Sequence, residues 1–473
     1  MTMMTLHQAL GFIQQQIPDA QLVGDGSMGL QRVHSDTRSL QTGDFFVALR
    51  GERFDANQFL PQARDAGAVA ALCSVSPADA RMSGIVVPNA LTALGALASG
   101  WRKQFALPMI AVTGSNGKTT VTQMIASILR VHAGDAAFAT RGNLNNDIGV
   151  PLTLLGLRAA HHIGVVELGM NHPGEIAGLA AMAQPTVALV NNAQREHQEF
   201  MHTVEAVARE NASVFAALPM DGVAVFPAGD EYSPLWQQLA AGRAQVCFGD
   251  EADGAQVFAR DVVWTDGAWA LSVHTPQGQA AVQLHIAGRH NVRNALAATA
   301  CALSAGVPLA AIAQGLSQFE PVKGRSRALS VVIAGRGVTV VDDTYNANPD
   351  SVVAAIEVLS ELPAPQLLVL GDMGEVGDNG PQFHAEAGAF ALHKKIPYLF
   401  ALGDQSAFAA AAFGGGAQHF DSMDALQAAV CLVMPQVGSV LVKGSRFMKM
   451  EQVVQALEAG ANKGQNACEG GVC

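Results

Sequence analysis

A lysine and two threonines follow a glycine-rich turn in the segment Thr113–Thr120, which has the sequence TGSNGKTT. Glycines let a backbone wrap closely around a polyphosphate, and successive N–H groups at a helix N-terminus supply positive potential. Lys118 would then reach the β- and γ-phosphates, and the Thr119 hydroxyl would ligate Mg²⁺. An apolar strand (Met109–Val112) precedes the turn, and apolar residues at helical spacing follow it. This context favours a nucleotide-phosphate site over a turn without a ligand.

Three further sequence patterns help to define the kind of nucleotide site. The usual phosphate-loop pattern G-x-x-x-x-G-K-[ST] requires glycine at position 112, where this chain has Val112, and its first glycine is Gly114. Residues 24–29 match G-x-G-x-x-G, but neither a strong strand precedes them nor a helix follows, so a plain loop is favoured. The sequence has no N-K-x-D pattern, which argues against a GTPase.

Polar side chains stand at the ends of two further apolar strands. Glu167 ends IGVVE, and Asn191-Asn192 ends TVALV, with His197 a few residues later. Ligands in open α/β sheets gather at the carboxyl ends of the strands. A carboxylate and an imidazole there could hold a second Mg²⁺ between ATP and an acceptor. The alternatives are a surface carboxylate and a solvated loop histidine.

Strand-like and helical runs alternate along most of the chain, which predicts an α/β protein. Length and alternation predict three domains: a small α/β domain at 1–88, a central domain with a parallel phosphate-loop sheet at 89–320, and a further domain of alternating strands and helices at 321–462. A flexible tail at 463–473 contains Cys468 and Cys473. After Val257 the pattern changes, and the segment up to residue 286 predicts antiparallel hairpins with TDG and PQG turns.

Composition narrows the class of protein. The chain has 473 residues, a net charge of −12, 49% hydrophobic and 14% charged residues. An acidic chain without a basic block is a poor non-specific binder of nucleic acid. Four cysteines (Cys73, Cys247, Cys301 and Cys431) lie among apolar or small residues, which predicts core packing in a reducing compartment. Because we find neither a signal peptide nor an uninterrupted membrane span, we expect a cytoplasmic protein. We also expect it to be a monomer.

Six motifs in this order resemble the Mur ligase family: TGSNGKTT, ELGMNHPGEI, GRHNVRNALAA, DDTYNANPDS, LGDMGEVG and LVKGSRFMKME. The N-terminal segment SDTRSLQTGDFFVALRGERFDANQF resembles the UDP-binding domain of the same ligases. TYNANPDS together with GNLNNDIGVPLTLL favours the member that adds D-alanyl-D-alanine to UDP-N-acetylmuramoyl-tripeptide, through an acyl phosphate, in peptidoglycan precursor synthesis. The DNPR-type motif of the sister ligase that adds diaminopimelate is absent.

The resemblance implies a UDP-substrate-binding domain at 1–88, a central ATPase domain at 89–320 and a Rossmann-like C-terminal domain at 321–462. It also implies ATP and Mg²⁺ as cofactors and assigns roles to individual residues. Lys118, Glu167 and His197 would be catalytic, and Thr119, Glu167 and His197 would hold Mg²⁺. The nucleotide would be bound by Gly114, Ser115, Asn116, Gly117, Lys118, Thr119, Thr120, Asn291, Asn294, Arg325 and Asp343. The UDP-sugar, the peptide and the dipeptide would be bound by Ser35, Arg38, Asn145, Asn146, Asn346, Asn348, Lys443, Ser445 and Arg446.

Purely structural roles remain as alternatives for several of these residues. Asn294 could pack in a helix, Asn346 and Asn348 could be turn residues before a proline, and Ser445 could cap a helix. Rival functions also stay open. The chain could be a sister Mur ligase or a folylpolyglutamate synthase that adds another amino acid, or a nucleotide-dependent binding protein without ligase activity.

Two departures from the family pattern concern metal ligation. Asn211 stands where family members commonly carry a carbamylated lysine, and asparagine cannot form a carbamate. Unless Glu210 or a water takes that place, the second Mg²⁺ site lacks an anionic group. Residues 226–231, FPAGDE, replace the usual Asn-Ala-Asp run.

Overall fold

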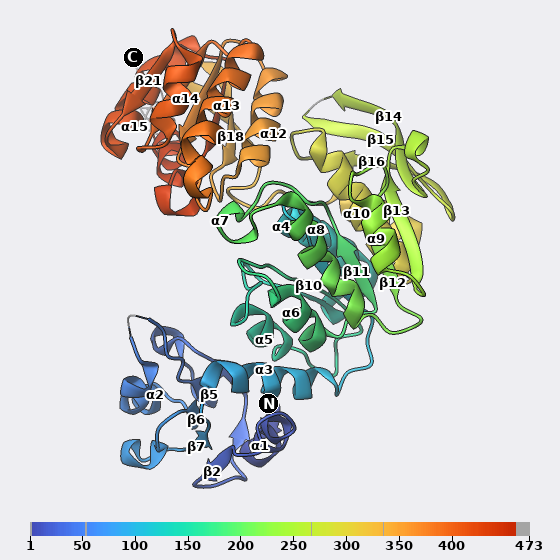
Figure 1. The fold of residues 1–473 in the computed structure, drawn as a ribbon, viewed down its shortest axis with the longest axis vertical. Coiled ribbons are helices and arrows are strands. Elements are labelled where there is room, and N and C mark those ends of the chain that lie inside the picture. The colour runs from blue at the N-terminus through green and yellow to red at the C-terminus, as the bar shows by residue number, and fades with distance from the viewer. Residues whose placement is uncertain (1, 53, 266, 334, 460–473) are drawn as a thin grey trace, which may run out of the picture.

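A computed structural model describes residues 2–52, 54–265, 267–333 and 335–459 of the chain. Its strands form three main sheets, which Figure 1 shows as three lobes in chain order along the longest axis. The predicted three-domain α/β fold is thereby confirmed. The domain boundaries at 88 and 320 remain our proposal, and the predicted tail at 463–473 lies outside the described residues.

The N-terminal lobe contains a five-stranded sheet of order β2-β7-β6-β5-β4, parallel except for the β2–β7 pair. A short antiparallel pair, β1 with β3, stands beside it. The elements are β1 (Met4–Thr5), α1 (Leu6–Gln14), β2 (Gln21–Val23), β3 (Gly29–Leu30), β4 (Arg32–His34), β5 (Asp44–Val47), α2 (Leu60–Asp65), β6 (Ala70–Cys73) and β7 (Ser83–Val86). No helix begins after the glycine pattern at 24–29, as predicted, although the short strand β3 starts at Gly29.

The central lobe contains a nine-stranded sheet of order β16-β15-β14-β13-β12-β11-β8-β10-β9. Its strands are β8 (Met109–Thr113), β9 (Ala137–Ala139), β10 (Ile163–Glu167), β11 (Val187–Val190), β12 (Val223–Pro227), β13 (Ala244–Gly249), β14 (Val257–Thr265), β15 (Ala268–Thr275) and β16 (Gly278–Leu284). Neighbours from β9 to β14 are parallel, and β14, β15 and β16 are antiparallel. The predicted change from parallel strands to hairpins is confirmed.

Helices connect these strands and cover the central sheet. They are α3 (Ala90–Arg102), α4 (Lys118–Ala133), α5 (Gly149–Leu154), α6 (Glu175–Ala183), α7 (Gln198–Met201), α8 (Val204–Ala212), α9 (Ser233–Leu239), α10 (His290–Ser304) and α11 (Leu309–Ser317). Strand β8 is buried on both faces: Met109 and Ala111 belong to one core and Ile110 and Val112 to the other. A central parallel strand covered by helices on both sides accounts for this uninterrupted apolar run.

The C-terminal lobe contains a six-stranded sheet of order β17-β18-β22-β19-β20-β21, parallel except for the β17–β18 hairpin. Its elements are β17 (Arg327–Ile333), β18 (Arg336–Asp343), α12 (Pro349–Ser360), β19 (Gln366–Gly371), α13 (Gly380–His393), β20 (Tyr398–Leu402), α14 (Ser406–Phe413), β21 (Ala417–Phe420), α15 (Met423–Val433) and β22 (Ser439–Lys443). Residues 451–459 are also helical.

The lobes are joined in two different ways. A single apolar cluster runs from Leu6 and Phe45 in the first lobe through Leu94 and Leu97 of α3 to Ala111 in the central sheet. The two clusters of the last lobe take in Ala287 but otherwise, among the buried residues described, begin at Val331. The first two lobes therefore share a core, whereas the third meets the central lobe mainly outside its own cores.

The cysteine prediction is only partly confirmed. Cys73 and Cys301 are buried and Cys247 is half-buried, but Cys431 is exposed because α15 turns Leu426 and Val430 inward instead. None of the helices in the described part of the chain combines the length and apolarity needed to cross a bilayer.

Candidate active site

A cleft of about 740 Å³ lies between the central and C-terminal lobes. It opens where β8, β10, β11 and β18 end, so the carboxyl ends of strands from two sheets meet there. It gathers these predicted site residues: Ser115, Asn116, Gly117, Lys118, Thr119, Thr120, Asn145, Asn146, Glu167, His197, Asn291, Asn294, Arg325, Asp343, Asn346, Asn348 and Lys443.

The glycine-rich turn joins β8 to α4, as predicted. Gly114 and Gly117 have φ angles of 131° and 80°, which side-chain-bearing residues rarely adopt. A Cβ on Gly117 would also stand 2.6 Å from Asn294 Oδ1 and 2.8 Å from Asn191 Nδ2. Gly117 is the N-cap of α4 and makes no side-chain cap bond, so the first-turn N–H groups are left for a ligand. The turn has the geometry of an anion-binding helix start.

The turn is held from behind by amide side chains of the loop after β11. Asn192 Oδ1 accepts from the Asn116 N–H at 2.8 Å, and the Nδ2 groups of Asn191 and Asn192 donate to the Asn116 carbonyl at 2.8 and 3.0 Å. Gln194 N–H donates to Ser115 Oγ at 2.9 Å. These bonds fix the turn before any ligand arrives. The apolar strand TVALV with two terminal asparagines was the signal for them.

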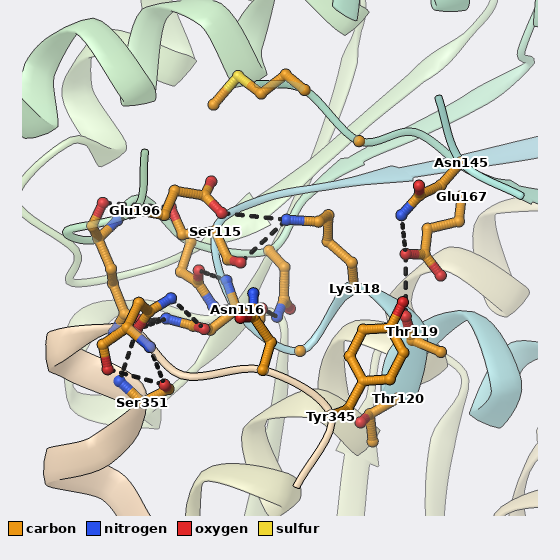
Figure 2. Close-up of a pocket in the computed structure, with 18 of the residues that line it drawn as sticks. Ser115, Asn116, Lys118, Thr119, Thr120, Asn145, Glu167, Glu196, Tyr345 and Ser351 are labelled. Carbon is orange, nitrogen blue, oxygen red and sulfur yellow. Dashed lines mark hydrogen bonds and ion pairs between the residues drawn. The ribbon is translucent and has the colours of Figure 1, made fainter. Parts of the chain in front are cut away.

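The Lys118 ammonium bends back over the turn (Figure 2). Its Nζ donates to the Gly114 and Ser115 carbonyls at 2.5 and 3.0 Å and to Glu196 Oε2 at 3.2 Å. The side chain of Glu196 is 6% exposed. Sequence reasoning missed Glu196, because an acidic residue in a polar loop carries no signal of its own.

Glu167 stands beside Thr119 at the end of β10 (Figure 2). Its Oε1 accepts from Thr119 Oγ1 at 2.9 Å and from Asn145 Nδ2 at 2.7 Å. Its Oε2 is buried and has no hydrogen-bond partner among the described residues. An unsatisfied buried carboxylate oxygen next to a hydroxyl is a fitting ligand set for Mg²⁺, a cation that prefers oxygen. Thr119 and Glu167 therefore fit one magnesium ion.

His197 is engaged elsewhere. Its Nδ1 lies 2.5 Å from Glu375 Oε2 of the C-terminal lobe. The close contact with His197 lowers the pKa of Glu375, although burial opposes the shift. No group of three or more His, Cys, Asp or Glu side chains in the described part of the chain is arranged to hold a metal ion. The role of His197 at a second magnesium ion stays a prediction.

Asn211 serves the phosphate turn. Its buried Oδ1 accepts from Gly114 N–H at 3.0 Å and from Thr113 Oγ1. Glu210, the possible anionic replacement, instead accepts from the N–H groups of Gly174 and Ile176 at 2.8 and 2.9 Å, where α6 begins. Glu210 is therefore tied to another helix and does not fill the place of the missing carbamate.

A chain of amides leads from the turn into α10. Asn191 Nδ2 donates to Asn294 Oδ1 at 3.0 Å, Asn294 Nδ2 to Asn291 Oδ1 at 2.8 Å, and Asn291 Nδ2 to the Ala287 carbonyl at 2.7 Å. Both asparagines of α10 are buried and line the cleft. They do more than pack in a helix, since they connect its first turn to the phosphate turn.

The C-terminal lobe contributes an ion pair and a stacked pair. Lys443 Nζ lies 2.5 Å from Asp343 Oδ2 and donates to the Asn346 carbonyl at 3.0 Å. Burial raises the pKa of Asp343. The charge and hydrogen bond of Lys443 oppose this effect and outweigh it, so the pKa lies below its usual value. The Arg325 guanidinium lies 4.0 Å from the centre of the Tyr345 ring. The ion pair thus holds Lys443, which we predicted to meet the peptide, beside Asp343, which we predicted to meet the nucleotide.

The structure refines the alternative roles considered for Asn348, as a turn residue, and for Ser445, as a helix cap. Asn348 caps α12 by accepting from Ser351 N–H at 2.8 Å, and its Nδ2 also reaches Asn116 Oδ1 at 2.9 Å. Ser445 makes no cap bond; its Oγ accepts from Gly374 N–H at 2.6 Å.

Five predicted residues are not among those that line the cleft: Gly114, Ser35, Arg38, Ser445 and Arg446. Ser445 is buried, and Arg446 is exposed and pairs with Glu451 at 3.1 Å. Ser35 and Arg38 lie in the N-terminal lobe, where the exposed Arg38 pairs with Asp36 at 2.7 Å. Their substrate roles stay predictions.

Comparisons with known proteins agree with this geometry. Residues 112–302 match the Mur ligase middle domain, and residues 327–446 match the Mur ligase glutamate ligase domain. The chain is 39% identical to the UDP-N-acetylmuramoyl-tripeptide–D-alanyl-D-alanine ligase of Escherichia coli, over 91% of this chain and 94% of that one.

Solved structures are similar over nearly the whole length. A crystal structure of MurF from Acinetobacter baumannii matches with a TM-score of 0.87 at 35% identity, covering 96% of this chain and 98% of that one. MurF ligase from Thermotoga maritima in complex with ADP matches with a TM-score of 0.80 at 25% identity, covering 92% and 98%.

Proposed function

Because this chain belongs to the Mur ligase family, we propose that it joins D-alanyl-D-alanine to UDP-N-acetylmuramoyl-tripeptide at the cost of ATP. It is an ATP-dependent ligase of peptidoglycan precursor synthesis. The observation that carries the assignment is the phosphate turn beside the Thr119–Glu167 pair, in a cleft that a second lobe completes. ATP supplies the phosphoryl group there, and the facing lobe supplies room for the acceptor.

The chemistry needs activation of a peptide carboxylate, because its negative charge resists attack by an amine. Transfer of the γ-phosphoryl group to that carboxylate gives an acyl phosphate and ADP. The dipeptide amine then attacks the acyl carbon, and phosphate leaves as the amide forms. Positioning and charge neutralisation provide most of the catalysis in such transfers.

The described residues supply that positioning. The first-turn N–H groups of α4 would hold the β- and γ-phosphates, and Lys118 would turn from Glu196 toward the transferred group. Thr119 and Glu167 would hold Mg²⁺, which offsets repulsion between the phosphate and the attacking carboxylate. Lys443 and Arg325 would approach from the C-terminal lobe. That lobe also excludes water, to which an acyl phosphate is vulnerable.

We also propose which lobe binds the UDP group, in which compartment the enzyme works, and its oligomeric state. The N-terminal lobe would bind the UDP group, since it shares a core with the central lobe and so holds the substrate at a fixed distance from the cleft. Ser35 and Arg38 remain our candidates there. We place the enzyme in the cytoplasm as a monomer, and the unpaired Cys73 and Cys301 agree with a reducing compartment.

Phosphate release from ATP, measured with a panel of UDP-peptides and amine acceptors, tests this function. Turnover should require both UDP-N-acetylmuramoyl-tripeptide and D-alanyl-D-alanine. Turnover with a single amino acid, or with a folate acceptor, would assign the chain to a sister reaction. Slow hydrolysis that ignores both substrates would indicate a nucleotide-dependent binding protein instead.

A further inference from the structure

The loop between β11 and α7, residues 191–197, touches two lobes at once. On one side its amide groups hold the phosphate turn through Ser115 and Asn116. On the other side Arg195 and His197 reach the C-terminal lobe. In Figure 1, α7, which follows this loop, lies between the central and C-terminal lobes. The loop therefore connects the C-terminal lobe physically to the phosphate turn.

Arg195 makes the most extensive of these contacts. Its main-chain N–H donates to Asp350 Oδ2 at 2.7 Å, and its Nε and Nη2 donate to Asp350 Oδ1 at 3.0 and 2.7 Å. Its Nη1 donates to Glu386 Oε2 at 3.0 Å, and the guanidinium lies 5.3 Å from the centre of the Phe383 ring. A planar fork of donors suits this arrangement, which joins α12 and α13 to a single side chain.

These contacts matter because the C-terminal lobe is not anchored by a shared core. Its clusters include Ala287 but no other buried residue described before Val331. Polar contacts at the cleft therefore set the orientation of the lobe. Asp350 stands in the first turn of α12, two residues after Asn348, which bonds to Asn116 of the phosphate turn. Fixing Asp350 thus fixes the lobe against that turn.

Resting on the ligase function proposed above, we propose that Arg195 is a positioning residue that seats the C-terminal lobe over the phosphate turn. Arg195 itself does not line the cleft. It acts through Asp350 and α12, and so determines where the end of β18, with Asp343 and its partner Lys443, faces ATP. Without this contact ATP still binds the phosphate turn, but the lobe closes in the correct orientation less often.

Kinetics of four variants test the proposal: Arg195→Ala, Arg195→Lys, Asp350→Asn, and the Arg195→Ala/Asp350→Asn pair. Arg195→Ala should lower kcat by roughly 10- to 100-fold, the scale of a small misplacement, while KM for ATP changes less than about threefold. Arg195→Lys should recover little, since an ammonium cannot bridge both carboxylates. The double variant should lose no more activity than the worse single variant, because both substitutions remove the same Arg195–Asp350 contact.

Small-angle X-ray scattering separates positioning from a general loss of structure. With ADP and Mg²⁺, Arg195→Ala should have a larger radius of gyration than the wild type and an unchanged melting temperature. Arg260→Ala is the matched control, because Arg260 forms a comparable pair with Glu251 on the exposed β14 surface. The proposal is wrong if Arg195→Ala keeps kcat within threefold of the wild type, or if its scattering curve is unchanged. If the wild type proves not to be a ligase, the scattering comparison still decides whether Arg195 seats the lobe.

Discussion

Replacing Glu167 by glutamine should separate folding from catalysis. The carboxylate is 1% exposed, and its Oε1 accepts hydrogen bonds from Thr119 and Asn145, while its Oε2 has no partner in the described structure. An amide oxygen can accept both of those bonds. An amide is neutral, however, and is a much weaker ligand for Mg²⁺.

The expected effect on stability is small because two terms oppose each other. Each of the two bonds loses its charge assistance, about 1 kcal/mol apiece. Relieving the desolvation of the buried charge restores about 1–3 kcal/mol, while the place of Oε2 stays polar because an amide nitrogen takes it. The free energy of unfolding should therefore stay within about 1 kcal/mol of the wild type. Losing a metal-ligand charge should lower kcat/KM at least roughly 100-fold, or about 2.7 kcal/mol of transition-state stabilisation.

Urea unfolding without nucleotide measures the first quantity, and phosphate release at increasing Mg²⁺ measures the second. Activity of Glu167→Gln should recover partly at high Mg²⁺, because weakened binding is offset by concentration. Glu251→Gln, a surface change of the same type, is the control and should alter neither measurement. Wild-type turnover by Glu167→Gln at ordinary Mg²⁺ would refute the assignment of the ligand. A loss of several kcal/mol in folding would refute the bond-by-bond argument.

Three further predictions concern the same cleft. Lys118→Ala should lower phosphate release by about 10³-fold, since it removes the charge aimed at the transferred group; near-normal turnover would exclude the site. Asn211→Ala should lower the free energy of unfolding by about 2 kcal/mol in urea, because the buried Gly114 N–H loses its acceptor, and an unchanged midpoint would contradict this. Lys443→Met should cost about 3 kcal/mol at pH 7 by leaving Asp343 buried without its partner. Since the pKa of Asp343 is depressed, the pair stabilises the protein above about pH 4, and the contribution is lost as the pH falls through the folded pKa, so the gap to wild type should close there in urea titrations.

The parts of the fold and site that sequence predicted are those with local signals. The apolar strand before Gly114 and the helical spacing after Lys118 placed the phosphate turn. Glu167 was predictable because it ends an apolar strand, and strand ends of a parallel sheet share one edge. The hairpins of β14 to β16 followed from their turn residues.

The remaining features depend on contacts between residues far apart in the chain. Arg195 stands 155 residues from Asp350 and 191 from Glu386. Nothing in the QREH segment indicates that it meets another lobe, since polar loop residues are ordinary solvent-facing positions. The prediction that Cys431 is buried was wrong for a related reason: apolar neighbours in sequence do not show which side of α15 turns inward. The sequence singled out Asn211 as a departure from the family pattern, but only the folded chain reveals that its amide supports Gly114.

The Lys118–Glu196 contact described above sets an entry condition for the cleft. The ammonium is already satisfied by two carbonyls and a carboxylate, so a visiting anion must outcompete an intramolecular partner that never diffuses away. Inorganic phosphate or sulfate, touching the helix start through one group, competes poorly against it. A nucleoside triphosphate, bound through its phosphates and its base at the same time, can displace the Glu196 carboxylate from Lys118. We therefore expect the Lys118 ammonium to bind the nucleotide while inorganic anions at ordinary concentrations leave its contact with Glu196 intact.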